Sequence, residues 1–227
     1  MATVSEPSGG VSSRTAAAPT GSAMTGWKPA NPAPLGLMGF GITTLVLSTM
    51  NANLVNFGKN LPVVLGLAIA YGGLSQLLAG MWEFRTGNTF GAVAFTSYGA
   101  FWISFYFLVQ TQLPALAKGG DVGNALGLYL WAWGIFTGLM FLCTFASPRA
   151  IQLVFLLLTV TFILLGIGNS GASNSAIHWG GYFGLATAAA ALYTAVGEIM
   201  ASVYGHDVLP LGRPYAPTAV LENQANV

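Results

Sequence analysis

The stretch Asn31-Pro32-Ala33-Pro34-Leu35-Gly36-Leu37-Met38-Gly39-Phe40 decides where the folded part of this chain begins. It stands between a polar segment and the first long apolar segment. Its two prolines fix φ and remove two backbone N–H donors, although Pro near a first turn is also an ordinary helix-start signal. A stiff, polar start of this kind predicts a helix that begins beside water rather than lipid. Asn31 is therefore a candidate for lining a solute pathway.

The composition is that of an integral membrane protein. Of the 227 residues, 54% are hydrophobic and 6% are charged, whereas a soluble domain is about 25% charged. The net charge of +1 argues against a nucleic-acid partner, since the sequence has no basic patch to neutralise phosphates. The single cysteine, Cys143, lies in an apolar run and can form no internal disulfide.

Six apolar segments are long enough to cross about 30 Å of hydrocarbon as helices, which predicts an all-α fold with six transmembrane helices. These segments are Pro34–Leu54, Pro62–Trp82, Thr89–Val109, Gly123–Phe145, Ile151–Gly168 and His178–Ser202. Short connections are expected at Asn56–Leu61, Glu83–Asn88, Gln110–Val122, Ala146–Arg149 and Asn169–Ile177.

The predicted organisation is one membrane domain with two tails. Residues 1–26 are rich in Ala, Ser, Thr, Gly and Pro and predict a disordered N-terminal tail rather than a cleaved signal peptide. Residues 27–203 form the six-helix domain, with Trp27 and Lys28 as interfacial anchors. Residues 204–227, which contain three prolines, form a polar C-terminal tail.

The basic residues predict the orientation in the membrane. With an even number of spans both tails lie on one side, which also carries the larger number of basic residues. That side has Arg14, Lys28, Arg85, Arg149 and Arg213, and the opposite side has Lys59 and Lys118. The positive-inside rule therefore places both termini in the cytoplasm.

The sequence carries no signature of an enzyme. It has no zinc-ligand cluster, no phosphate-binding glycine loop and no nucleophile with a base at motif spacing, and the two histidines, His178 and His206, lie at a span entrance and in a tail. We therefore expect neither catalysis nor a metal or cofactor. A compact polytopic protein of this kind is instead expected to move a solute across the bilayer.

Polar residues within the spans indicate the kind of solute. They are mostly hydroxyls and amides, which bind a small neutral molecule or a weak monovalent anion without a fixed countercharge. Hydroxyls in membrane helices also often bond a carbonyl of their own helix. The candidates for the substrate pathway are Asn31, Thr43, Thr44, Gln76, Ser97, Gln152 and Thr159, and Phe40, Tyr98 and Phe101 are candidates for a constriction.

Two carboxyl groups are candidates for proton coupling. Carboxylates within a membrane are costly and usually functional. Glu198 is predicted to lie inside the last span, near its cytoplasmic end, where it can also reach interfacial water. Glu83 lies at a span end, where it is expected to pair with Arg85.

Small residues four apart, as in Gly127 with Gly123 and Gly184 with Gly180, predict flat helix faces for close packing. The pattern does not distinguish packing within one protomer from packing between protomers.

Several sequence blocks resemble the acetate uptake transporter family, which includes bacterial succinate–acetate permeases. The first is the stretch from Asn31 to Leu37, and the resemblance covers about residues 28–212. Further blocks are Tyr71-Gly72-Gly73, Gly80 to Glu83, Gly87-Asn88-Thr89-Phe90-Gly91, Ala94 to Trp102, Gln152, Phe155, Leu158-Thr159, Gly168-Asn169, Gly197-Glu198 and Leu209-Pro210.

The resemblance implies a hexamer in the plasma membrane, with one pathway per protomer for acetate, succinate and related short carboxylates. It implies either proton-linked transport or an anion channel, and a narrow point formed by Phe40, Tyr98 and Leu158. The residues alone suggest Phe40 and Tyr98 but not Leu158. The alternative interpretation is a channel for small neutral solutes such as urea, amides or ammonia.

Overall fold

The structure is a computed structural model that describes residues 27, 29–119 and 122–213. The predicted N-terminal tail (residues 1–26), Lys28 and residues 214–227 lie outside the described residues. Six helical segments are long and apolar enough to cross a membrane. They are α1 (Ala33–Asn51); α2 (Phe57–Ile69) with α3 (Gln76–Thr86); α4 (Thr89–Phe107) with α5 (Leu113–Gly119); α6 (Val122–Leu142); α7 (Arg149–Ile167); and α8 (Asn174–Tyr204).

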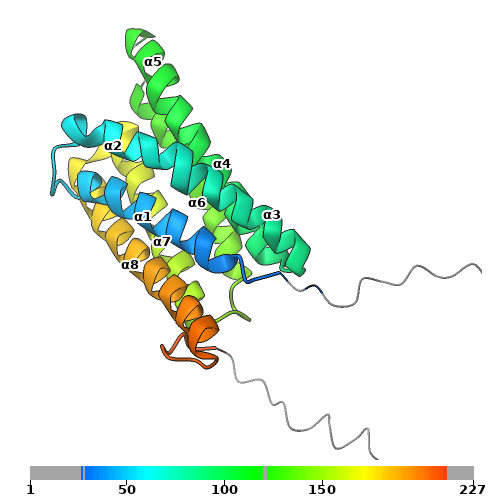
Figure 1. Cartoon of the computed structure of the whole chain (residues 1–227). Coiled ribbons are helices and arrows are strands. Elements are labelled where there is room, and N and C mark those ends of the chain that lie inside the picture. The colour runs from blue at the N-terminus through cyan, green and yellow to red at the C-terminus, as the bar shows by residue number, and fades with distance from the viewer. Residues whose placement is uncertain (1–26, 28, 120–121, 214–227) are drawn as a thin grey trace, which may run out of the picture.

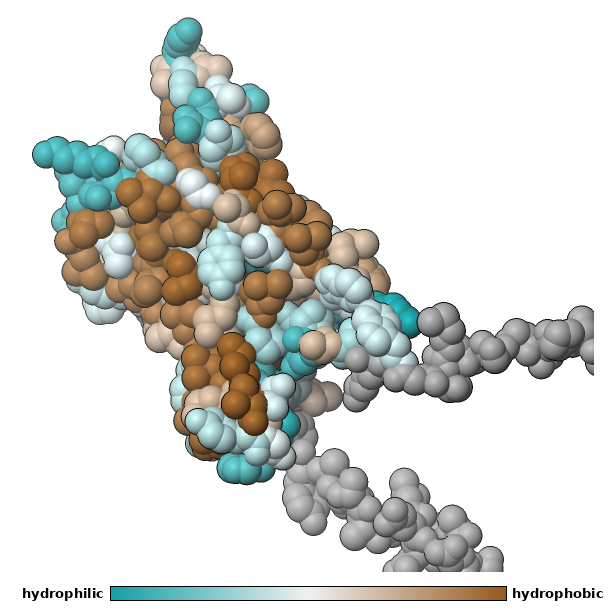
Figure 2. All heavy atoms as spheres, viewed as in Figure 1, coloured by the Kyte–Doolittle hydropathy of each residue, from teal (hydrophilic) through white to brown (hydrophobic). Residues whose placement is uncertain are grey.

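The helices form a bundle with the starts of α1, α4 and α7 at one end (Figure 1). The ends of α3 and α8 lie at the same end, and α5 extends beyond the other helices at the opposite end. On the face shown in Figure 2, hydrophobic residues cover most of the middle of the bundle and hydrophilic residues gather toward its ends. This distribution is the one that a hydrocarbon layer requires.

Several segments that interrupt the helices are π-helical rather than extended. Ala70–Ser75 joins α2 to α3, Leu108–Gln112 joins α4 to α5, and Gly168–Ala172 follows α7. In the first of these, the carbonyl of Tyr71 crosses α1 at Gly39, where an added Cβ would lie 2.6 Å from the carbonyl oxygen. A glycine is therefore required at this crossing.

Four of the five predicted connections are largely helical. In Glu83–Asn88 the helix α3 continues to Thr86, and in Asn169–Ile177 residues 169–172 are π-helical and α8 begins at Asn174. Helix α2 begins at Phe57 and contains Pro62 within its early turns. The predicted connection Gln110–Val122 is helical as far as Gly119, so the segment Thr89–Gly119 has 31 residues. At 1.5 Å per residue it is about 46 Å long, which exceeds the hydrocarbon thickness of about 30 Å.

The glycine-rich faces pack within the protomer. A Cβ added to Gly181 of α8 would clash with the backbone nitrogen of Ala52, just after α1. The neighbouring Gly184 lies against Ser48 of α1, and Gly127 of α6 lies against Ser170. Helix α8 therefore approaches α1 closely enough to exclude side chains between the two backbones.

The first part of the predicted C-terminal tail is folded. We call residues 205–213 the strap, because they turn back from α8 and pack on the start of α7. The backbone N–H groups of Arg149 and Ala150 donate to the carbonyls of Gly212 and Leu211, over 2.9 and 3.1 Å. The strap therefore caps the N-terminus of α7, where helical N–H groups have no partner within the helix.

Candidate functional site

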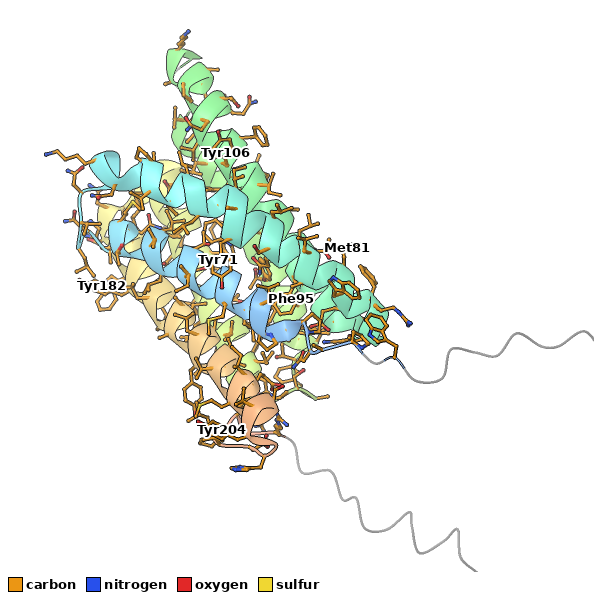
Figure 3. All side chains as sticks on the ribbon, in the orientation of Figure 1. Tyr71, Met81, Phe95, Tyr106, Tyr182 and Tyr204 are labelled. Carbon is orange, nitrogen blue, oxygen red and sulfur yellow. The ribbon has the colours of Figure 1, made fainter. Side chains whose placement is uncertain are left out.

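A cavity of about 390 Å³ opens at the end of the bundle where α1, α4 and α7 begin. Its walls come from these three helices, from α3 and α8, and from the turn before α7. The lining residues are Asn31, Ala33, Leu37, Phe40, Gln76, Asn88, Phe90, Gly91, Ala94, Phe95, Tyr98, Ala146, Ser147, Pro148, Ile151, Val154, Phe155, Leu158, Thr194 and Glu198. Figure 3 shows one of them, Phe95, beside the first half of α1.

The outer part of the cavity is polar, and we call Asn31, Asn88, Ser147 and Glu198 its mouth. The first three side chains precede or cap the helices that start there. Asn88, for example, accepts the backbone N–H of Gly91 over 3.1 Å and so caps α4. Helix starts therefore explain why polar groups gather at the mouth, since capping favours Asn and Ser.

Phe40, Tyr98 and Leu158, the residues of the predicted constriction, all line the cavity, and we refer to the three together as the constriction. Each of these buried residues is the eighth to the tenth residue of a helix that starts at the mouth, namely α1, α4 and α7. At 1.5 Å per residue they lie about 10 to 14 Å along their helices. The three parallel helices thus bring an aromatic pair and a leucine to one depth, and all three residues line the cavity.

The constriction is held by aromatic packing. The rings of Phe40 and Tyr98 have centroids 5.7 Å apart, and Tyr98 also packs on Phe155. The hydroxyl of Tyr98 lies 2.9 Å from Oγ1 of Thr137, which itself donates to the carbonyl of Trp133. Because that carbonyl can only accept, Tyr98 donates to Thr137 and turns its hydroxyl away from the cavity.

One buried polar side chain that lines the cavity has an atom without a partner. Gln76 is 1% exposed, and its Oε1 makes no hydrogen bond within the described residues. An unpaired buried amide oxygen is costly, typically by about 1–3 kcal/mol. A bound molecule or water that donates a hydrogen bond there would remove this cost.

Five predicted pathway residues do not line this cavity. Thr43 and Thr159 bond the carbonyls of Gly39 and Phe155 in their own helices, over 2.8 and 2.7 Å. This is the alternative that hydroxyls in membrane helices often adopt. Thr44, Ser97 and Gln152 also lie outside the lining, as does the candidate constriction residue Phe101, which packs in the core.

Gln152 organises the turn that forms part of the mouth. Its Nε2 donates to the carbonyl of Ser147 over 2.9 Å, and its Oε1 accepts from Nη1 of Arg149 over 2.7 Å. The side chain thereby holds the turn before α7, and Ser147 in turn lines the cavity.

The predicted pair between Glu83 and Arg85 is not formed. Glu83 is buried, accepts from the hydroxyl of Thr86 over 3.2 Å and leaves its Oε1 without a partner. The guanidinium of Arg85 instead lies 5.6 Å from the centre of the Trp27 ring. The predicted pair does not form because residues two apart on a helix point in different directions.

Glu198, the other predicted proton-coupling residue, lies at the mouth. Its Oε1 is 2.9 Å from Nη2 of Arg213, and its Oε2 accepts from Nδ2 of Asn31 over 3.1 Å. The described residues contain no group of three or more His, Cys, Asp or Glu side chains that could hold a metal ion.

The sequence matches the model of the GPR1/FUN34/yaaH family over residues 15–209, which is most of the chain. The chain belongs to the GPR1/FUN34/yaaH family. Its members include the succinate-acetate/proton symporter SatP of Escherichia coli K12, which is 45% identical over 83% of this chain and 98% of that protein. Acetate permease A of Emericella nidulans is 45% identical over 84% of this chain and 69% of that protein.

The fold of the GPR1/FUN34/yaaH family is also known from a solved structure. The bacterial acetate channel SatP matches this chain with a TM-score of 0.73 and 43% identity, over 82% of this chain and all of that chain. The resemblance expected from the sequence blocks is therefore confirmed, and so is the all-helical membrane fold. The named relatives are transport proteins rather than enzymes, as expected.

In this member of the GPR1/FUN34/yaaH family, reasoning from the sequence missed several lining residues. Asn88 and Ser147 lie at helix starts, where their residue types also suit simple capping. Phe90 and Phe155 are indistinguishable by residue type from core aromatics. Of these residues, Asn88 could have been identified as a lining residue, because it caps a helix inside the block Gly87 to Gly91.

Proposed function

We propose that this protein transports acetate and related short carboxylates, including succinate, through the cavity. The observation that carries the proposal is the unpaired Oε1 of the buried Gln76 amide, a hydrogen-bond acceptor in the same cavity lining as Phe40, Tyr98 and Leu158. The names of the relatives, a succinate-acetate/proton symporter and an acetate permease, support the choice of substrate.

In the proposed mechanism, a carboxylate enters at the mouth and loses water at the constriction. Losing that water is costly unless other hydrogen bonds replace it. The unpaired Oε1 of Gln76 can accept a hydrogen bond from the protonated acid, and Nε2 of the same amide is a donor suited to a carboxylate oxygen. The substrate crosses either as the anion, in an anion channel, or as the neutral acid with its proton.

A second candidate function is a channel for small neutral solutes, such as urea, amides or ammonia. The observation that favours it is the charge of the lining, since Glu198 is the one charged residue among the described residues that line the cavity. A pathway of this kind conducts without moving charge or a linked proton.

The experiment that separates these functions is uptake of labelled acetate and labelled urea into proteoliposomes. We expect protein-dependent acetate uptake that is lost when Phe40 and Tyr98 are altered, and a rise with an inward proton gradient if transport is proton-linked. Urea uptake without acetate uptake would contradict carboxylate transport and support the neutral-solute channel.

The same assay tests the two carboxyl groups proposed for proton coupling. If Glu83 or Glu198 carries the coupled proton, then Glu83→Gln or Glu198→Gln abolishes the response to the gradient and leaves uptake without a gradient. A full response in both variants would exclude both carboxyls from coupling.

We propose a hexamer in the plasma membrane, with one pathway per protomer and both termini in the cytoplasm. The described basic residues at the mouth end (Arg85, Arg149 and Arg213) outnumber those at the opposite end (Lys59 and Lys118), which supports this orientation. Residues 27–203 are the proposed transport domain. The mass of the detergent-solubilised complex, compared with 23.5 kDa for one chain, tests the hexamer.

A further inference from the structure

The strap brings a guanidinium to the mouth of the cavity and holds it there. Besides the two backbone bonds to the start of α7, the hydroxyl of Tyr193 donates to the carbonyl of Pro210 over 3.1 Å. Leu211 is buried and packs over Gly197, one residue before Glu198. The backbone that carries Arg213 is thus fixed on both α7 and α8.

Both oxygens of the Glu198 carboxylate are occupied. Arg213 contacts one oxygen and Asn31 donates to the other, while the second nitrogen of the guanidinium, Nη1, lies 3.2 Å from Asp207. The side chain of Glu198 is 22% exposed and that of Arg213 is 43% exposed, so water reaches both.

The orientation of Asn31 is set by its own backbone. Its Oδ1 accepts the N–H of Ala33 over 3.0 Å, which turns the Nδ2 donor toward Glu198. The amide therefore supplies a hydrogen bond to Glu198 but no charge. Among the contacts of this carboxylate, the guanidinium alone offsets its charge.

Glu198 is also the one charged residue among the described residues that line the cavity. A bare carboxylate at this position repels an approaching anion, and because water reaches the side chain, that repulsion weakens as the salt concentration rises. Asp207 shares the guanidinium but does not line the cavity, and Arg149 is bonded to Gln152.

We infer that Arg213 is a specificity-determining residue, whose guanidinium neutralises Glu198 at the mouth and so admits carboxylate anions. The inference rests on the proposed function and adds a role for the strap. Arg213 acts on the substrate through Glu198, so its role requires the carboxylate to be present.

The test compares variants by the concentration dependence of acetate uptake into proteoliposomes. At about 0.01 M salt, where the screening length is about 30 Å, Arg213→Gln is expected to raise the half-saturating acetate concentration about threefold to tenfold. The maximal rate stays unchanged, and the effect shrinks at about 0.15 M salt. Arg213→Lys keeps the charge and is expected to behave as the wild type.

The double variant Glu198→Gln with Arg213→Gln isolates the electrostatic role. It is expected to restore half-saturation to within about twofold of the wild type, because no bare carboxylate remains. Asp207→Asn is the matched control, since it removes the other carboxylate that contacts Arg213 without changing the lining. Thermal unfolding in detergent checks that each variant is folded.

Three results would overturn the inference. The first is a half-saturating acetate concentration in Arg213→Gln equal to that of the wild type. The second is a double variant whose half-saturating concentration stays as high as that of Arg213→Gln. The third is an equal rise in that concentration at both salt concentrations. If Arg213→Gln does not fold, the half-saturating acetate concentration of Glu198→Gln is compared with that of the double variant. A higher half-saturating concentration in the double variant would overturn the inference. No acetate uptake by the wild type would overturn the proposed function as well, whereas normal wild-type uptake confines the failure to the role of Arg213.

Discussion

Leu158 and Leu156 show how position gives one residue type two functions on the same helix. Leu158 is buried and lines the cavity beside Phe40 and Tyr98. Leu156, two residues earlier, is 44% exposed on the outer surface of the bundle. The same truncation of these two side chains therefore separates an effect on the cavity lining from an effect on the outer surface of the bundle.

At the residue scale, we predict that Leu158→Ala widens the constriction and admits larger acids such as lactate. The removed atoms leave space beside two rigid rings, which have little freedom to close it. Competition of unlabelled lactate against labelled acetate uptake measures the change. Leu156→Ala is the matched control and should keep the wild-type substrate range, and an unchanged range in Leu158→Ala would show that the constriction lies elsewhere.

At the scale of helices, the contact between α8 and α1 depends on a missing side chain. We predict that Gly181→Ala lowers the melting temperature in detergent, because the added Cβ meets the backbone after α1 and overpacking costs about 1–3 kcal/mol. Gly66→Ala in α2 is the control, since no atom lies within 4 Å of its added Cβ. Equal melting temperatures for the two variants would contradict the close approach.

The sequence predicted the helices better than it predicted their ends. The six spans followed from hydropathy, because hydrocarbon requires long apolar helices whatever the packing. Residues 110–119 contain Gln, Thr, Pro and Lys, which suit a loop, yet they are helical and follow α4 without a break. The strap was assigned to a polar tail because its order comes from contacts with α7 and α8, which composition does not encode.

The same limit applies to the candidate site. Phe40 and Tyr98 were identifiable as aromatics near polar helix starts, whereas Leu158 resembles any leucine of an apolar span and required the family resemblance. The hydroxyls of Thr43 and Thr159 suited a polar pathway by residue type. Their bonds to their own helices depend on side-chain conformation, which the sequence does not show.

At the scale of the whole molecule, the two ends of the bundle are predicted to face different compartments. In a Cys143→Ser background, which removes the single cysteine of the chain, we expect Ala117→Cys at the end of α5 to react with an impermeant maleimide added to intact cells. Ser202→Cys, near the end of α8, should react after permeabilisation only. Both substitutions leave the Lys and Arg distribution unchanged, and the reverse labelling pattern would contradict cytoplasmic termini.

The strap also has a consequence for the order in which the protein is made. The groups that cap α7 belong to Leu211 and Gly212, which leave the ribosome after all six spans have been synthesised. During translation the first turn of α7 therefore lacks these two acceptors, and Glu198 lacks its guanidinium partner. The contacts at the mouth of the cavity are completed by the last part of the described chain, so they form only after the sixth span has been made.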